Sequence, residues 1–485
     1  MTLLLVLILL SIITYAVVQR SISNITKTPV WLCWLVMMFP AFLWTGWVYI
    51  VGDEEPIPII LLLIPLIVCP LLYGWLIQKG KITPQESSTE KKEALPNKPE
   101  VSLARPIDNE EETTLRNCFP WNIYYLQNID YRPQAILCRG KLKTVPEEAY
   151  QKIKKNVEGA FGDRFFLIFQ ESLRGQPFFA LVPNPQAKKN NSNTEQLTRP
   201  GLALFLLLVT VLTTTVAGVE FGGFELEQIE SQPEILTQGL LYSIPLLLII
   251  GIHELAHYWA TVAYNIRCSL PYMIPLPFFL GTLGAFVYKR SPIPHRRALF
   301  DTAISGSIAG FVVTLPFLFW GLSQSQAVPL DESNLFNFTA LDPRLSFLFA
   351  IFAKGALGSQ LEPGMAVNLH PTAIAAYIGL LFVAFNLMPV GQLNGGHIVH
   401  AVFGQRMAVA IGQIARILAL FFALVHSSFW VWTIILWFMP LLDRPALNDI
   451  TELNNWRDFC GLLALGLLLL IILPLPVPIA NLLNI

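Results

Sequence analysis

Long apolar runs constrain the fold of this sequence more than any other feature. Each of six runs has about the 20 residues that an α-helix needs to cross the hydrocarbon core of a bilayer. Of the 485 residues, 54% are hydrophobic and only 13% are charged, with a mean hydropathy of +0.54. The sequence therefore predicts an α-helical polytopic membrane protein and excludes an ordinary soluble enzyme. The runs are residues 30–51, 57–77, 201–218, 239–262, 299–320 and 371–387.

Residues 1–18 form a further apolar run, which is either a cleavable signal peptide or a first membrane helix. A signal peptide carries its positive charge before the apolar region, whereas Arg20 and Lys27 follow this run. We therefore expect a membrane helix, and the sequence leaves open whether it stays attached. Residues 30–51 and 57–77, joined by an acidic link, predict a helical hairpin.

Two polar segments divide the chain. Residues 78–114 and 186–199 are rich in Lys, Glu, Ser, Pro and Asn, a composition that cannot bury enough apolar surface to offset chain entropy. We expect both to be linkers, the first of them disordered. The N-terminal membrane helices are then residues 1–77, a small domain is residues 115–185, and a polytopic membrane domain is residues 200–485.

The small domain is predicted to be α+β and to lie outside the membrane. A strand is expected at 134–142, a helix from Pro146 to a stop at Gly162, and a hairpin from 164–169 and 178–182. No catalytic side chains cluster in this segment, so we expect a structural or substrate-gating role.

Charge and cysteine content exclude some functions. A net charge of −1 leaves no electrostatic footprint for nucleic acid, so no nucleic-acid partner is expected. The six cysteines are scattered without CxxC pairs, which indicates core residues. The loop 220–234 contains five glutamates and no Lys or Arg, whereas 289–297 and the linkers are basic. The positive-inside rule places the loop outside and the small domain on the cytoplasmic or stromal side.

The sequence His253-Glu254-Leu255-Ala256-His257 lies within an apolar helix. Residues four apart lie on one helix face, so both imidazoles can bind one metal ion, and Glu254 can reach water at that ion. The pattern is typical of zinc-dependent hydrolysis, with Glu254 as the base. The alternative is two histidines satisfied by polar neighbours, but ionisable groups at membrane depth are usually functional.

Residues 270–286 are too short and too broken by proline and glycine to span the bilayer. We expect a re-entrant β-hairpin, whose exposed strand, near Gly281 and Gly284, holds an extended peptide by β-augmentation. A plain connecting loop is the alternative. The next helix is predicted at 299–320, with Asp301 as its N-terminal cap, and 321–370 is read as a lid.

A second polar cluster, residues 386–397, follows the apolar run 371–387. The predicted path of the chain gives this helix the same direction as the helix of His253. Both clusters are therefore expected at the same depth in the membrane.

These motifs resemble the site-2 protease family of intramembrane zinc metalloproteases, whose signatures are HExxH and N-x-x-P-x-x-x-L-D-G. His253, Glu254 and His257 match the first signature, and Asn386, Pro389, Leu393 and Gly395 match the second. The small domain is similar to that of the plastid and cyanobacterial branch.

The resemblance implies a site-2-protease-like core with a re-entrant β-hairpin and one zinc ion. Its ligands would be His253, His257 and the residue at 394, with Glu254 as catalytic base. Asn386, Gly281 and Gly284 would bind substrate. The expected substrates are membrane proteins or membrane peptides, within the lipid bilayer. The expected location is a plasma or thylakoid membrane of a cyanobacterium-like cell, or a plastid membrane.

One position departs from the family pattern, because Asn394 stands where the family places its aspartate ligand. A neutral amide oxygen offsets less of the charge of zinc than a carboxylate does, which weakens binding. His397 or His400 could substitute, or both could be interfacial residues. Two hypotheses follow: an active protease with Asn394 as a weak ligand, or a catalytically impaired membrane scaffold or chaperone. A transporter is disfavoured, because no paired half-helices occur.

Overall fold

The computed structural model has two units, residues 1–101 and 102–485, and each is described by itself. It describes residues 29–51, 107–132, 135–172, 175–184, 199–224, 232–276, 279–330, 338–425 and 429–485, with isolated residues before 77. In the first unit, helix α2 (Val30–Val51) confirms the expected run 30–51. The predictions for 1–18, 52–77, most of 78–114 and 186–198 lie outside the described residues, apart from those isolated positions.

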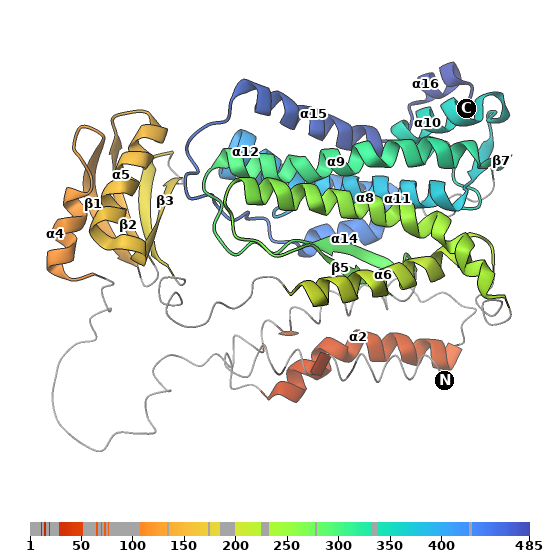
Figure 1. Ribbon diagram of the computed structural model, residues 1–485, viewed down its shortest axis with the longest axis horizontal. Helices are drawn as coiled ribbons and strands as arrows, with labels where there is room; N and C mark the ends of the chain where they lie inside the picture. Colours follow the sequence, from red (N-terminus) through yellow and green to blue (C-terminus); the bar gives the residue numbers. More distant parts are fainter. Residues whose placement is uncertain are drawn as a thin grey trace. The chain divides into compact units, whose positions relative to one another are not determined.

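The N-terminal part of the second unit contains a four-stranded antiparallel sheet of order β1-β2-β4-β3 (Figure 1). The expected strand at 134–142 is β2 (Ala135–Leu142), and the expected hairpin is β3 (Phe165–Glu171) with β4 (Pro177–Pro183). Edge strand β1 (Tyr124–Arg132) was not predicted, because its polar residues hide the apolar alternation. Helix α5 (Pro146–Phe161) ends at Gly162, as expected, where φ is +58°.

Helix α4 (Asn109–Asn117) starts inside the segment expected to be a linker. Its start is a capping box, in which the backbone N–H of Asp108 donates to the Glu111 carboxylate at 3.2 Å. Leu115 is fully buried in the core of the sheet domain. The ordered domain therefore begins before residue 115.

The rest of the second unit consists mainly of apolar helices: α6 (Pro200–Phe221), α8 (Leu236–Ala263), α9 (Arg296–Ser323), α13 (Gln405–Val425) and α15 (Asn455–Ile472). Within the described residues, six helices are long and apolar enough to cross a membrane, counting α2. Helix α11 (Pro371–Leu387) was expected to span as well, but its 17 residues extend only about 25 Å. The shorter helices are α10 (Phe347–Leu357), α12 (Asn394–Phe403), α14 (Trp430–Phe438) and α16 (Val477–Leu483).

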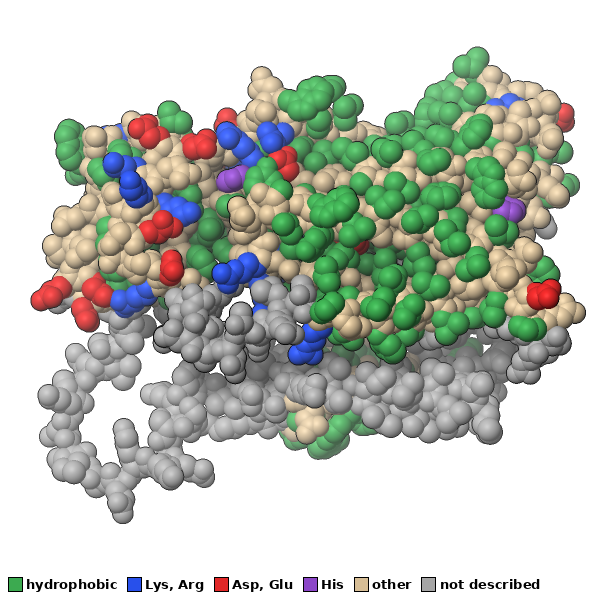
Figure 2. Space-filling model, viewed as in Figure 1, with side chains coloured by type: hydrophobic (Ala, Val, Ile, Leu, Met, Phe, Trp, Pro, Cys, Tyr) green, Lys and Arg blue, Asp and Glu red, His purple; other side chains and the backbone are tan. Residues whose placement is uncertain are grey.

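Helices α8, α9 and α11 pack side by side, with α9 running opposite to the other two (Figure 1). Fully buried apolar side chains fill the space between them, among them Ile249, Leu299 and Leu380. Hydrophobic side chains also cover the outer face of α8 and α9 (Figure 2), where Trp259 and Val312 are more than half exposed. An apolar outer face suits contact with lipid.

Two short strand pairs complete this unit. In the predicted re-entrant hairpin, β5 (Tyr272–Pro275) pairs with β6 (Thr282–Phe286), so that Ile274 lies opposite Gly284. In the predicted lid, β7 (Gln326–Pro329) pairs with β8 (Met365–Asn368), and α10 lies between them in the chain. The first pair lies next to the HExxH helix α8 through β6.

The prediction that Asp301 caps a helix is wrong. Helix α9 begins at Arg296, where the ring Nδ1 of His295 accepts from the backbone N–H of Ala298 at 3.1 Å. Asp301 lies more than one turn further on and forms a two-fold ion pair with Arg457, with both N–O distances 2.8 Å. The helix was predicted three residues too short at this end because Arg296 and Arg297 interrupt the apolar run.

Cysteine labelling tests the predicted membrane orientation. In a background without the six native cysteines, a cysteine in the loop 220–234 should react with an impermeant thiol reagent added outside. A cysteine in 188–193 should react only after the membrane is opened, because basic segments are retained on the inner side. The opposite labelling pattern would reverse the orientation.

Candidate metal centre

Helix α8 carries His253 and His257 on one face, with ring centroids 4.8 Å apart. His253 is fully buried, and neither of its ring nitrogens has a hydrogen-bond partner among the described residues. The Nδ1–H of His257 donates to the carbonyl oxygen of Thr302 at 2.5 Å, which leaves its Nε2 with a lone pair. Buried imidazole nitrogens without partners are expensive, so a bound ligand is the natural compensation.

Helix α9 approaches the two rings through glycines, and a Cβ at either position would collide with a ring. A Cβ at Gly306 would lie 2.3 Å from Nε2 of His257, and one at Gly310 would lie 2.8 Å from Nδ1 of His253. The glycines at 306 and 310 therefore leave room for the histidine rings and also allow close helix packing.

Gly306→Ala should reduce zinc binding by the purified protein and, with it, any hydrolysis. The added methyl group must displace the His257 ring or the helix, and such overpacking costs about 1–3 kcal/mol. Gly466→Ala on α15 is the matched control, because its Cβ meets nothing within 4 Å. Equal zinc content in the two variants and wild type would mean that the ring does not need this space.

Helix α12 supplies Asn394 as its first residue. The turn between α11 and α12 is tight: a Cβ at Gly395 would lie 1.8 Å from the carbonyl oxygen of Leu387. The amide nitrogen of Asn394 lies 2.9 Å from Nε2 of His257 and 3.2 Å from Oγ of Ser307. The two sequence motifs, 137 residues apart, thus meet at one point.

A zinc ion fits this donor set in part. The unpartnered nitrogens of His253 and the lone pair on His257 are suitable donors, and Asn394 can add its amide oxygen if the amide turns over. No three His, Cys, Asp or Glu side chains group as a metal site within the described ranges. Asn394, whose amide is neutral, is the side chain that lies close enough to His257 to complete such a set.

Glu254 lies beside these groups at the wall of a cavity of about 650 Å³. It is 7% exposed, and its carboxylate oxygen is 3.9 Å from Nε2 of His253. His257, Asn394 and Asn386 line the same cavity. The amide nitrogen of Asn386 donates to the carbonyl of Phe382 at 3.0 Å, which leaves its oxygen available as an acceptor.

The two hairpin glycines have different surroundings. Gly281, with φ +78°, packs against α6, where a Cβ would lie 2.5 Å from Cα of Thr214. Gly284, with φ +105°, lies in β6 against the ring of Phe382, which in turn contacts His253. The structure thus gives Gly281 a packing contact with α6 and places Gly284 close to the histidines.

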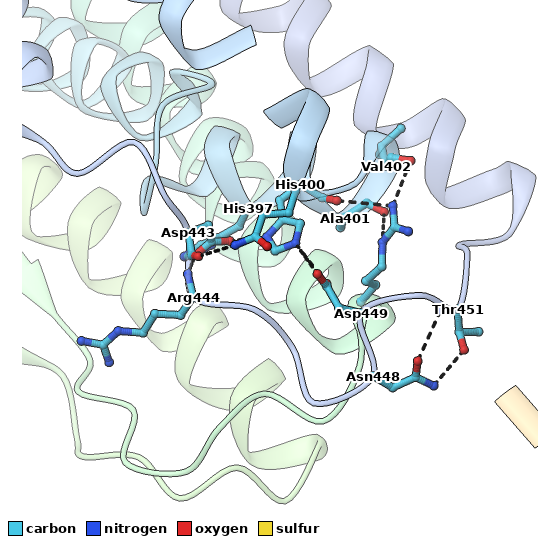
Figure 3. Close-up of polar contacts among 11 residues, drawn as sticks. His397, His400, Ala401, Val402, Asp443, Arg444, Asn448, Asp449 and Thr451 are labelled. Atoms are coloured by element: carbon cyan, nitrogen blue, oxygen red, sulfur yellow. Dashed lines mark hydrogen bonds and ion pairs between the residues drawn. The ribbon is translucent and has the colours of Figure 1, made fainter. Parts of the chain in front are cut away.

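His397 and His400 belong to a polar network with two aspartates (Figure 3). Oδ2 of Asp443 lies 2.7 Å from Nδ1 of His397 and 2.8 Å from Nδ1 of His400. Nε2 of His400 lies 3.1 Å from Oδ2 of Asp449. Because both nitrogens of His400 contact carboxylates, it is no free metal ligand. The alternative that His397 and His400 are ordinary interfacial residues does not account for their contacts with the two aspartates.

Opposing effects set the pKa values in this network. Burial alone would lower the pKa of His400, but hydrogen bonds to Asp443 and Asp449 and their charges raise it to about 9. Burial would raise the pKa of Asp443, but His397 and His400 lower it below its ordinary value. At neutral pH the network therefore holds a charged imidazolium between carboxylates.

The network also connects α12 to the sheet domain. Leu447 lies between the two aspartates in the chain. Its carbonyl accepts from the backbone N–H of Phe169 in β3 at 2.7 Å, and its own N–H donates to the carbonyl of Ile293 at 2.9 Å. The guanidinium of Arg296 donates to the C-terminal carbonyls of α12, including that of Ala401 at 2.9 Å. Asp443, Asp449 and Arg296 were not predicted as partners of α12, because no local spacing in the sequence links them to this helix.

Two family models match parts of the chain. Residues 241–426 match the model of peptidase family M50, and residues 113–190 match a model described as the EGY3 middle domain. Residues 241–426 are therefore similar to peptidase family M50, the site-2 protease family. The first match contains His253, Glu254, His257 and Asn394, and the second covers the four-stranded sheet described above.

Curated relatives are zinc metalloproteases by name. The chain is 28% identical over 346 residues to the "Probable zinc metalloprotease EGY2, chloroplastic" of Oryza sativa subsp. indica, covering 70% of this chain and 61% of the relative. It is 26% identical over 352 residues to EGY1 of Arabidopsis thaliana, covering 67% and 63%. The chain thus spans about three fifths of the length of these relatives. No solved structure matches it.

Proposed function

We propose that this protein is an intramembrane zinc metalloendopeptidase that cleaves transmembrane or membrane-flanking peptide segments. The observation that supports this most is the meeting of His257 and Asn394 at 2.9 Å, with Glu254 at the wall of the same cavity. The apolar outer face of α8 and α9 supports a substrate that arrives within the bilayer.

His253, His257 and Asn394 would hold the metal. A bound zinc ion supplies Lewis acidity, which polarises a peptide carbonyl and favours ionisation of water near neutral pH. Glu254 accepts the proton of the attacking water and returns it to the leaving amine. Thr302 holds the His257 ring in the tautomer whose Nε2 points its lone pair at the site.

The peptide must be extended at the cleaved bond, and strand β6 offers it a backbone edge. In the described residues β6 pairs only with β5, and Ala285 and Phe286 line the cavity. A substrate strand beside β6 would be held by main-chain hydrogen bonds, with the oxygen of Asn386 receiving an N–H. Gly284 would allow close approach, whereas Gly281 would serve the hairpin's packing.

The location proposed is a plastid membrane, or the plasma or thylakoid membrane of a cyanobacterium-like cell, because the relatives are named chloroplastic. The alternative function is a membrane scaffold or chaperone that binds membrane segments without cleaving them. Asn394 favours this alternative, since an amide can donate to the lone pair of His257 and so close the site to a metal.

Metal removal tests the proposal. Purified protein in detergent micelles should cleave a single-span membrane peptide, lose that activity with 1,10-phenanthroline, and regain it with added zinc but not magnesium. Imidazole donors favour zinc over magnesium, which prefers oxygen. Cleavage that persists unchanged after zinc is removed would overturn the proposal, and peptide binding without cleavage would favour the scaffold.

A further inference from the structure

The cavity beside Glu254 has one strongly charged wall. The segment that continues from β6 lines it with Lys289 and Arg290, and the segment after α14 adds Arg444. These three cations face only two carboxylates in the cavity lining, Glu254 and Asp443. Because Asp443 already contacts His397 and His400, Glu254 is the carboxylate of the described lining that remains to face Lys289 and Arg444.

Two of the cations have no carboxylate of their own among the described residues. Arg444 is exposed, and its guanidinium extends away from the network of Asp443 and His400 (Figure 3). Lys289 is half-buried and forms no ion pair in the described part of the chain. Burial lowers the pKa of Lys289, an effect that Asp443 and Glu254 partly offset and a substrate carboxylate would offset further.

The chain direction places Lys289 and Arg290 after Gly284, the β6 residue that lies close to the histidines. After β6 the backbone remains paired with the segment that precedes β5. The backbone N–H of Ser269 donates to the carbonyl of Tyr288 at 2.9 Å, and Lys289 and Cys268 form an isolated antiparallel β-bridge. Extended residues rise roughly 3.3 Å each, so Lys289 lies about 10 Å along the chain from Phe286. A peptide paired with β6 would therefore carry its flanking residues past Lys289 and Arg290.

We propose that this cavity selects peptides with Asp or Glu in the segment flanking the cleaved bond, held by Lys289, Arg290 and Arg444. The proposal rests on the function proposed above and names its substrate class. Cations that only set the membrane orientation of the chain would not need to line a cavity. Cations that only bind lipid headgroups would not need to share a cavity with Glu254. A positively charged cavity wall speeds the association of an acidic peptide and disfavours the binding of a basic one.

Binding to Glu254→Gln protein tests the proposal without any cleavage. Fluorescent single-span peptides with acidic, neutral or basic flanks are titrated in zwitterionic micelles. The acidic peptide should bind more tightly than the neutral one, on the order of tenfold at low salt, and the advantage should shrink as salt rises. Equal affinity of all three peptides would overturn the proposal.

Charge reversal locates the effect. Lys289→Glu combined with Arg444→Glu should make the basic peptide the preferred one. Arg406→Glu, on exposed Arg406 of α13 outside this cavity, is the matched control and should leave the preference unchanged. The same shift in the control, or a change only in the binding of anionic lipid vesicles, would contradict the assignment. If the protein prefers the acidic peptide but wild type does not cleave it, the proposed protease function would be overturned, whereas the proposed binding site for acidic peptides would be retained.

Discussion

Replacing Glu254 with glutamine is expected to lower the cleavage rate by about 10²- to 10⁴-fold while the protein folds normally. The amide has nearly the same size as the carboxylate but cannot accept the proton of the attacking water. Glu254 makes no hydrogen bond in the described part of the structure that the substitution would break. Cleavage of a single-span peptide by the purified variant measures the effect.

Zinc content separates a chemical loss from a structural one. The variant should retain the zinc content of wild type, because the metal donors are His253, His257 and Asn394. Undiminished cleavage would remove Glu254 from the mechanism. A loss of cleavage together with zinc would show that the substitution disturbs the whole site.

Asn394→Asp is expected to raise zinc affinity by more than about tenfold and to raise hydrolysis with it. Two effects act in the same direction. A carboxylate adds an anionic oxygen at nearly constant volume, and it cannot donate to Nε2 of His257 as the amide nitrogen does at 2.9 Å. The lone pair of His257 is then left for the metal. Zinc titration of the metal-free variant measures the first effect, and peptide cleavage measures the second.

Asn386→Asp is the matched control for Asn394→Asp. It adds the same charge to the same cavity, but its side chain bonds to Phe382 and not to a histidine. Its zinc affinity should stay near that of wild type. An equal gain in both variants would mean that any added anion attracts zinc. No gain at 394 would mean that another group completes the site, and zinc without cleavage would favour the scaffold.

Several membrane helices and the first half of the site were predicted from the sequence, whereas α13 and α15 were not. A bilayer core is a uniform apolar solvent, so run length alone marks α6, α8 and α9. The helical period then puts His253 and His257 on one face whatever their neighbours are. The direction of α11 followed from counting spans, and it brought Asn394 to the same depth.

The remaining features depend on contacts between distant segments. Asp443 approaches His397 from 46 residues away, and no residue near it in the sequence points to α12. Strand β1 is half polar because it lies at a sheet edge, so its alternation is weak. The space beside the histidines depends on Gly306 of another helix, whose role as a packing residue gave no sign of the rings it faces.

The zinc content of purified protein tests the central claim most directly. Wild type and a His253→Ala, His257→Ala double variant are prepared from the same zinc-supplemented cells, and metal per chain is measured by mass spectrometry. We expect wild type to hold up to about one zinc ion per chain and the double variant to hold essentially none. Equal zinc in both proteins, or none in wild type and none in Asn394→Asp, would contradict a metal centre at these residues.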